Sequence, residues 1–169
     1  MKNYSQARGE HPIEIRLARN SEAQALAEMS RKLIEQGLTW RWQSPQMLSR
    51  IKHPDSVVLV ARTRVELVGF AVMEFHDIHA HLNLLAVSST GRRRRTGTSL
   101  LNWLEKSALE AGIGQVVLEV RYNNMGARSF YRENHYEEVE VLPGYYQGKE
   151  NAVRMVHHLI EPEIEKQRP

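Results

Sequence analysis

The pattern of apolar and polar positions divides the chain into stretches of strand and helix character. Residues 13–19 alternate apolar and polar side chains, which is typical of a strand with one buried face. Residues 96–111 instead place Leu100, Leu104 and Ala108 on one side of a helix. These two periods recur along the chain, and together they predict a single α/β domain.

The remaining elements follow from the same periods and from the residues that start and stop them. Ser21 and Gln24 predict a capping box at the start of the first helix, and Gly37 predicts its end. The expected elements are, in order, a strand at 13–19, helices at 21–37 and 43–51, strands at 57–62, 66–75 and 79–87, a helix at 96–111, a strand at 116–121, a helix at 124–134, and strands at 136–141 and 151–159. The early strands suit an antiparallel meander with a tight turn at residues 63 and 64, whereas the segment 82–121 suits a parallel crossover.

Length and composition limit the class of protein. The 169 residues suit one domain over 1–169, with a core at about 13–159 and frayed ends at 1–11 and 161–169. The absence of cysteine excludes a thiol nucleophile, a disulfide framework and a thiolate metal site. No apolar run approaches the ~18 residues of a membrane span, and the polar start lacks the centre of a signal peptide. We therefore expect a cytoplasmic protein without a membrane partner.

The positive charge is concentrated at one place. The formal net charge is only +3, and four of the 23 Lys and Arg residues form the run Arg92 to Arg95. This run joins an apolar strand to the start of an amphipathic helix, where unpaired backbone N–H groups favour an anion. Alone, the run would indicate a solvated basic turn. In this position it predicts a phosphate site rather than a nucleic-acid surface.

The residues around this run resemble a known family. The phrase Leu84-Leu85-Ala86-Val87, followed by Arg92 to Gly97 and Leu100-Leu101, is similar to the GNAT superfamily of acetyltransferases, whose pyrophosphate loop reads Gln/Arg-x-x-Gly-x-Gly/Ala. Arg95 stands where the middle glycine of that loop belongs. The second half resembles the bacterial ribosomal-protein-alanine N-acetyltransferases through Leu118-Glu119-Val120-Arg121, Asn124, Ala127, Tyr131, Tyr145-Tyr146, Ala152 and Met155.

The resemblance implies a fold, a co-substrate and a set of roles. The fold would be a mixed, mostly antiparallel α/β (α+β) sheet flanked by helices and splayed near its middle, and the co-substrate would be acetyl-CoA, without a metal. Glu119 would be the general base, Tyr131 the general acid, and Tyr145 with Tyr146 a gate over the substrate. The implied coenzyme-binding residues are Leu85, Ala86, Val87, Arg92, Arg93, Arg94, Arg95, Thr96, Gly97, Thr98 and Asn124.

The residue types suit this chemistry independently of the resemblance. An amine attacks a thioester only when it is neutral, so a carboxylate such as Glu119 is needed to accept its proton, directly or through water. A positioned hydroxyl such as that of Tyr131 would stabilise the departing thiolate, and backbone N–H groups at the end of the 82–87 strand would hold the developing oxyanion.

Each of these residues also has a purely structural interpretation. Glu119 fits an outward position on a half-exposed strand equally well, Tyr131 fits the core, and Asn124 fits a helix cap. Tyr145 and Tyr146, expected in the loop between the last two strands, fit a buried aromatic pair.

Histidines raise two further questions. His79 and His81 share one face of a strand, but nothing nearby completes a metal site, which favours a structural or substrate-side role. His135 stands where the family usually ends a helix with glycine, so His135 or Asn134 is expected to adopt a left-handed conformation.

These observations predict an N-acetyltransferase that acts on a protein or peptide N-terminus. A small amine, amino acid or polyamine is the alternative acceptor. A CoA-binding or nucleic-acid-binding module without turnover is a third interpretation, which the presence of Glu119 and Tyr131 disfavours. The oligomeric state stays open, with a homodimer among the alternatives.

Overall fold

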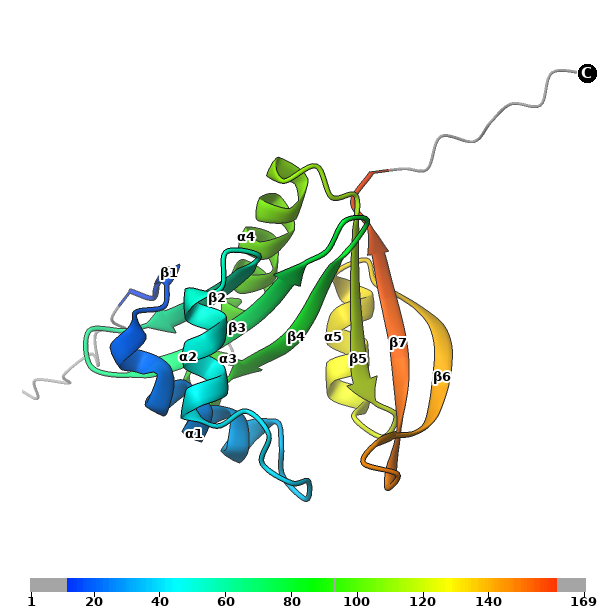
Figure 1. Ribbon diagram of the computed structural model, residues 1–169, viewed down its shortest axis with the longest axis horizontal. Helices are drawn as coiled ribbons and strands as arrows, with labels where there is room; N and C mark the ends of the chain where they lie inside the picture. Colours follow the sequence, from blue (N-terminus) through cyan, green and yellow to red (C-terminus); the bar gives the residue numbers. More distant parts are fainter. Residues whose placement is uncertain (1–11, 93, 161–169) are drawn as a thin grey trace, which may run out of the picture.

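The computed structural model describes residues 12–92 and 94–160, so the expectations for both ends and for the side chain of Arg93 lie outside it. Seven strands form one sheet in the order β1-β2-β3-β4-β5-β7-β6 (Figure 1). Within it, only the β4–β5 pair is parallel, and the other pairs are antiparallel. The strands are β1 (Glu14–Leu17), β2 (Ser56–Arg62), β3 (Leu67–Phe75), β4 (Ala80–Val87), β5 (Gln115–Arg121), β6 (Glu137–Tyr146) and β7 (Glu150–His158).

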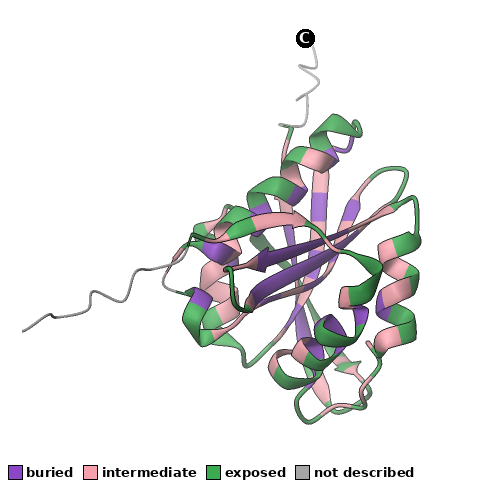
Figure 2. Cartoon of the chain, turned by 90° about the vertical axis from the view of Figure 1, so that its left-hand side faces the viewer, coloured by how far each residue is buried: buried purple, intermediate pink, exposed green. Residues whose placement is uncertain are grey.

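Helices cover both faces of the sheet, and the alternation of the strands decides which residues meet them. One face packs Val60 and Phe70 against α1 (Ala23–Leu33) and α2 (Ser44–Lys52). The other face packs Leu59 and Met73 against α4 (Thr96–Glu110) and α5 (Met125–Glu133). A short helix, α3 (Ser89–Arg92), precedes α4. The exposed residues of the helices lie on their outer sides, and the middle of the sheet is buried (Figure 2).

A β-bulge in β4 changes the direction of the sheet. Val72 pairs with Leu84 whereas Met73 pairs with Leu82, so Asn83 is an extra residue on β4. Such a bulge bends its strand and increases its twist. The parallel ladder between β4 and β5 accordingly stops after two residue pairs, the second joining His81 to Val117. Beyond this point the two strands diverge, which confirms the expected splay (Figure 1).

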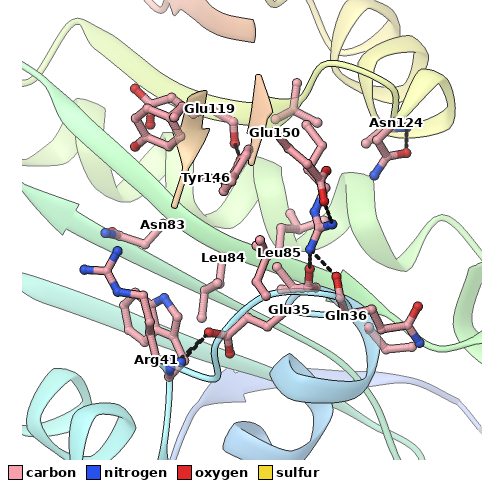
Figure 3. Close-up of a pocket in the computed structure, with 18 of the residues that line it drawn as sticks. Glu35, Gln36, Arg41, Asn83, Leu84, Leu85, Glu119, Asn124, Tyr146 and Glu150 are labelled. Carbon is pink, nitrogen blue, oxygen red and sulfur yellow. Dashed lines mark hydrogen bonds and ion pairs between the residues drawn. The ribbon is translucent and has the colours of Figure 1, made fainter. Parts of the chain in front are cut away.

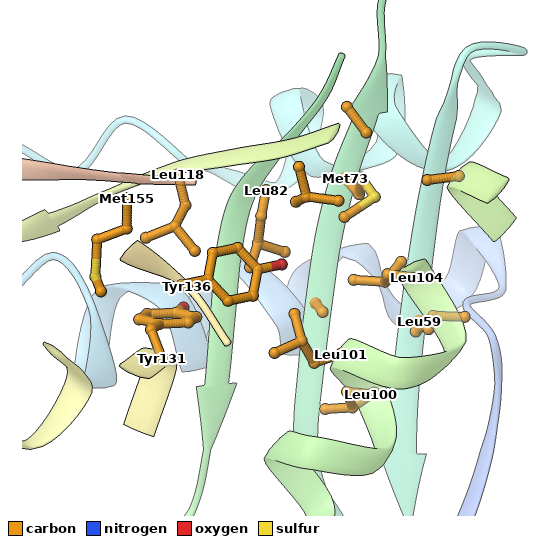
Figure 4. Packing of buried hydrophobic residues seen from close by; sticks show 14 of the residues in the cluster. Leu59, Met73, Leu82, Leu100, Leu101, Leu104, Leu118, Tyr131, Tyr136 and Met155 are labelled. Carbon is orange, nitrogen blue, oxygen red and sulfur yellow. The ribbon is translucent and has the colours of Figure 1, made fainter. Parts of the chain in front are cut away.

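The two halves of the sheet still share one apolar core below the splay. Leu82 of β4, Leu101 of α4, Leu118 of β5 and Tyr136 belong to the same buried cluster (Figure 4). Burying a side chain of this size contributes roughly 1.5–3 kcal/mol. The divergence therefore opens a gap in the hydrogen-bonded ladder without separating the molecule into two bodies.

The element order, fold class, parallel crossover and tight turn are confirmed, whereas three local predictions are wrong. The first helix ends at Leu33 and not near Gly37. The capping box does not use Ser21 and Gln24: a 3-10 turn at Asn20–Glu22 comes first, and Glu22 accepts a hydrogen bond from the Arg19 N–H at 2.8 Å. The third error concerns β6, which continues through Tyr145 and Tyr146 instead of ending before them.

Two remaining observations concern single segments. His135 has a φ of 69°, so the expected left-handed residue after α5 is present. In the part of the chain that the structure describes, no helix has the length and apolar character needed to cross a membrane.

Candidate active site

A cleft of about 970 Å³ lies where β4 and β5 diverge. Its walls come from both strands, from the loop between α1 and α2, from the start of α5 and from the hairpin between β6 and β7. Figure 3 shows Arg41 and Asn83 at one end of this cleft and Asn124 at the other. Elements far apart in the sequence therefore meet here because the bulge has opened the sheet.

Glu119 occupies the middle of the cleft and is held from two sides. Residues of β5 alternate between the core and the cleft, and Glu119 falls on the cleft face with its side chain only 6% exposed. Its Oε2 lies 2.6 Å from His81 Nε2, and its Oε1 accepts a hydrogen bond from Arg154 Nε at 3.0 Å. Burial alone would raise the pKa of Glu119, but His81 and Arg154 outweigh burial and lower this pKa to about 2.

His81 belongs to the candidate site, and sequence reasoning missed that its partner is Glu119. The strand pattern made His81 a structural or substrate-side residue, whereas the structure places it on the cleft side of β4 in direct contact with Glu119. A signal was present: the predicted parallel crossover makes the two strands neighbours, and both residues alternate with buried apolar positions. No group of three metal-ligating side chains occurs among the described residues.

Tyr131 lines the cleft from α5 and is 7% exposed. Its ring packs edge-to-face against Phe130 and Tyr136, with centroids 5.2 and 5.5 Å away. Burial, assisted by Tyr146, raises the pKa of the Tyr131 hydroxyl, so the group keeps its proton at neutral pH. Tyr131 therefore lies in the core, as its structural interpretation expected, and it also lines the cleft, while its role as general acid stays a prediction.

Tyr145 and Tyr146 end β6 beside the cleft, rather than occupying a loop as expected. The Tyr146 hydroxyl donates a hydrogen bond to the Glu119 carbonyl at 3.1 Å, and the Arg121 guanidinium lies over its ring at 5.7 Å. Tyr145 is 45% exposed and packs edge-to-face on Tyr146. Tyr146 is thus held by two contacts, while Tyr145 is half exposed at the cleft mouth and interacts with the Glu119 carboxylate.

The expected coenzyme loop joins β4 to α4. Arg95 is the residue before α4 and has φ 56° and ψ 20°, a left-handed conformation that explains why the family pattern has glycine there. Arg92 turns back, and its Nε donates to the Val87 carbonyl at 3.2 Å. The Thr96 side chain is buried and donates to the Gly91 carbonyl at 2.8 Å, so Thr96 has only its backbone N–H to offer a ligand.

Two glycines shape this loop for close packing. A Cβ on Gly97 would meet the Phe130 ring at 3.1 Å, and a Cβ on Gly91 would meet Val87 Cγ1 at 2.8 Å. Arg92, Arg95, Gly97 and Thr98 line a second hollow of about 600 Å³ at the start of α4. Its cationic rim and helix N-terminus suit the phosphates of a coenzyme.

The other expected coenzyme contacts are distributed around the opening. The β4–β5 ladder has ended before Leu85, Ala86 and Val87, so the β5-facing edge of this segment has no ladder partner among the described strands. Leu85 lines the cleft, whereas Ala86 is buried against the opposite cluster. Asn124 caps α5, its Oδ1 accepting the Ala127 N–H at 3.1 Å, and also lines the cleft.

Contacts between the α1–α2 loop and the second half of the sheet bound the acceptor side. Glu35 is buried and accepts hydrogen bonds from the backbone N–H groups of Arg41 and Trp42 at 2.7 and 3.2 Å. Gln147 exchanges two hydrogen bonds with the backbone of Thr39, at 3.1 and 3.2 Å, across 108 residues of sequence. We call this contact the Thr39–Gln147 bridge.

Comparisons with known proteins agree with this geometry. A model of the acetyltransferase (GNAT) family matches residues 23–136. An uncharacterised N-acetyltransferase of Methanocaldococcus jannaschii is 35% identical over 98 residues, which are 57% of this chain and 63% of that protein, less than two thirds of its length. An N-alpha-acetyltransferase of Sulfurisphaera tokodaii is 25% identical over 165 residues, 90% of this chain and 96% of that protein.

A solved structure extends the likeness to the whole fold. The ribosomal-protein-S18-alanine N-acetyltransferase from Escherichia coli has a TM-score of 0.76 at 20% identity, with 90% of this chain and 98% of that chain covered. At this identity the likeness concerns the fold. The family model, by contrast, covers more than half of the sequence, including both the loop at Arg95 and the site at Glu119. The chain therefore belongs to the acetyltransferase (GNAT) family.

Proposed function

We propose that this chain acetylates the N-terminal amine of a protein or peptide. The observation that carries the proposal is the position of the His81–Glu119 pair, in the middle of a cleft that continues from the coenzyme side to the acceptor side. The Thr39–Gln147 bridge narrows the acceptor side, which suits the end of a chain better than a segment passing through. The name of the S. tokodaii relative supports the same class of acceptor.

On the coenzyme side, the loop and the strand edge would hold different parts of acetyl-CoA. We assign the phosphates to the loop before α4, through Arg92, Arg95 and the first backbone N–H groups of the helix. The unpaired edge of residues 85–87 would hydrogen-bond the pantetheine amides, and Asn124 lies farther along the same path. Acetyl-CoA, once bound, supplies an activated acyl group as a thioester.

The proton of the acceptor amine would pass to the His81–Glu119 pair. A carboxylate with a pKa of about 2 is a weak base, so Glu119 by itself gives little driving force for deprotonating an ammonium group. Histidine is the side chain suited to accept protons near neutral pH. In this mechanism the Glu119 carboxylate accepts the Nε2–H of His81, which leaves Nδ1 with the lone pair that receives the proton.

Two further groups would act as the thioester opens. Tyr131 is neutral and lines the cleft, and its hydroxyl would donate to the departing thiolate. Backbone N–H groups of the diverging β4 edge would stabilise the negative charge that develops on the acetyl oxygen. The expected roles of Glu119 and Tyr131 thus stay proposals, with His81 added between the carboxylate and the amine.

An acceptor screen tests the proposal. Thiol release from acetyl-CoA should be fastest with peptides that have a free N-terminus, and blocking that terminus should abolish the signal even when an internal lysine is present. Release with polyamines or amino acids but not with peptides would instead assign the chain to small acceptors. Absence of release with every amine would contradict the catalytic assignment.

A further inference from the structure

Arg41 differs from the other charged residues that line the cleft. Each of these has a bonded partner: Glu119 has Arg154, Glu150 has Arg121, Arg50 has Glu74, and Glu35 accepts the backbone N–H groups described above. The Arg41 guanidinium makes no ion pair or hydrogen bond with any residue that the structure describes. A new anion could approach it without breaking an existing pair.

The position of Arg41 is fixed even though its side chain is exposed. Its backbone N–H is bound at 2.7 Å by Glu35, whose carboxylate is itself buried and bonded to the Ser30 hydroxyl at 3.0 Å. Arg41 lies at the end of the cleft beside Asn83, with Leu84 and Glu119 farther in (Figure 3). The backbone of Arg41 is therefore held at a defined place at this end of the cleft, and its exposed side chain extends from there.

The charges of Arg41 and Glu119 both affect the pKa of Tyr145. Burial raises the pKa of the Tyr145 hydroxyl, Glu119 adds to this rise, and Arg154 and, to a smaller extent, Arg41 oppose it. Glu119 and Arg41 both line the cleft and both act electrostatically on Tyr145 at its mouth. An acceptor that matches both has an ammonium group for Glu119 and His81 and a carboxylate for Arg41.

We propose that Arg41 is a specificity-determining residue that binds a carboxylate of the acceptor close to the amine that is acetylated. The inference rests on the proposed function, and it narrows the acceptor to chain ends with an acidic side chain in their first residues. The α-carboxylate of a free dipeptide or amino acid would offer Arg41 the same negative charge. The two kinds of acceptor differ in whether the peptide chain continues beyond the first residues.

Matched peptides test this inference. Two peptides that differ only by Glu or Gln at the second residue should differ about fivefold in kcat/KM, mainly through KM, because an exposed ion pair contributes modestly. The preference should disappear in Arg41→Gln, persist in Arg41→Lys and fall with rising salt. Arg64→Gln, in the exposed β2–β3 turn, removes the same charge outside the cleft and should leave the preference unchanged.

The outcomes separate this inference from the proposed function. Peptides that are acetylated equally with Glu or Gln, by both the parent chain and Arg41→Gln, would overturn the role of Arg41 and leave the proposed function intact. No acetylation of either peptide would overturn the proposed function. A dipeptide with a free carboxyl end, compared with its amide, tests the second source: an Arg41-dependent difference only here supports carboxylate binding by a small acceptor.

Discussion

At the scale of single residues, the site depends on how His81 and Glu119 share charge. Glu119 stays ionised across the whole range in which an enzyme of this kind would be assayed, because its pKa is lowered to about 2. A change of rate near neutral pH therefore cannot come from Glu119 itself. It has to come from another group of the bound complex or from the acceptor amine.

The pH dependence of kcat tests the pairing. Because the pKa of Glu119 is lowered to about 2, its own protonation should not change kcat across the assayed pH range, and Glu119→Gln should keep the shape of the parent pH profile at a lower kcat. His81→Gln should lower kcat further, by roughly 10²–10⁴-fold, while acetyl-CoA affinity stays the same.

Opposite results would assign the proton differently. If His81→Gln kept most of the parent kcat and Glu119→Gln lost it, the carboxylate would be the acceptor, through water or directly. An acceptor peptide with a less basic amine serves as the control, because it shifts only the part of the profile that belongs to the substrate.

At the scale of elements, the coenzyme loop stores strain at Arg95. A non-glycine residue in the left-handed region costs about 1–2 kcal/mol. Arg95→Gly should therefore raise the free energy of unfolding by about 1 kcal/mol, while Arg95→Ala should not. Both variants lose one cationic group from the hollow at α4, so both should bind CoA several-fold more weakly, and this loss should shrink at high salt.

Urea unfolding and calorimetric titration with CoA check the two effects separately. Tighter CoA binding by Arg95→Gly than by the parent chain would show that the arginine hinders the coenzyme. Equal stabilisation by glycine and alanine would show that the backbone conformation is not the source of the strain.

The elements also differ in how well the sequence predicts them. The hydrophobic periodicity and the residues that start or end elements sufficed to predict the order of strands and helices, because both signals come from side chains close together in the sequence. The end of β6 was misplaced because Pro143-Gly144 looks like a turn, whereas pairing with β7 continues to Tyr146 opposite Glu150. The Thr39–Gln147 bridge depends on residues 108 apart, so no local pattern could predict it. The bulge at Asn83 was likewise invisible, since only the register with β3 reveals it.

At the scale of the whole molecule, a shallow break in the sheet creates the site. Two β4–β5 residue pairs and a shared core hold the halves together on one side, while the Thr39–Gln147 bridge connects them across the cleft. Arg121 strengthens that connection, because its guanidinium donates to the carbonyls of Ile34 and Gln36 at 2.8 and 2.7 Å. The opening is therefore bounded at both ends, and a ligand that fills it replaces the missing sheet contacts.

Hydrogen exchange tests this view of the cleft. Acetyl-CoA should slow the exchange of backbone amides in residues 82–87 and in the first turn of α4, because these N–H groups gain partners. At about 100-fold excess over the dissociation constant, the ligand stabilises the folded state by about 2.7 kcal/mol, which limits the slowing to roughly 100-fold. The exposed β2–β3 turn at residues 63–66 opens locally and should exchange at the same rate with or without ligand. Slowing confined to residues that open only by global unfolding, with no added effect along β4, would mean that the coenzyme does not use the diverging strand edge.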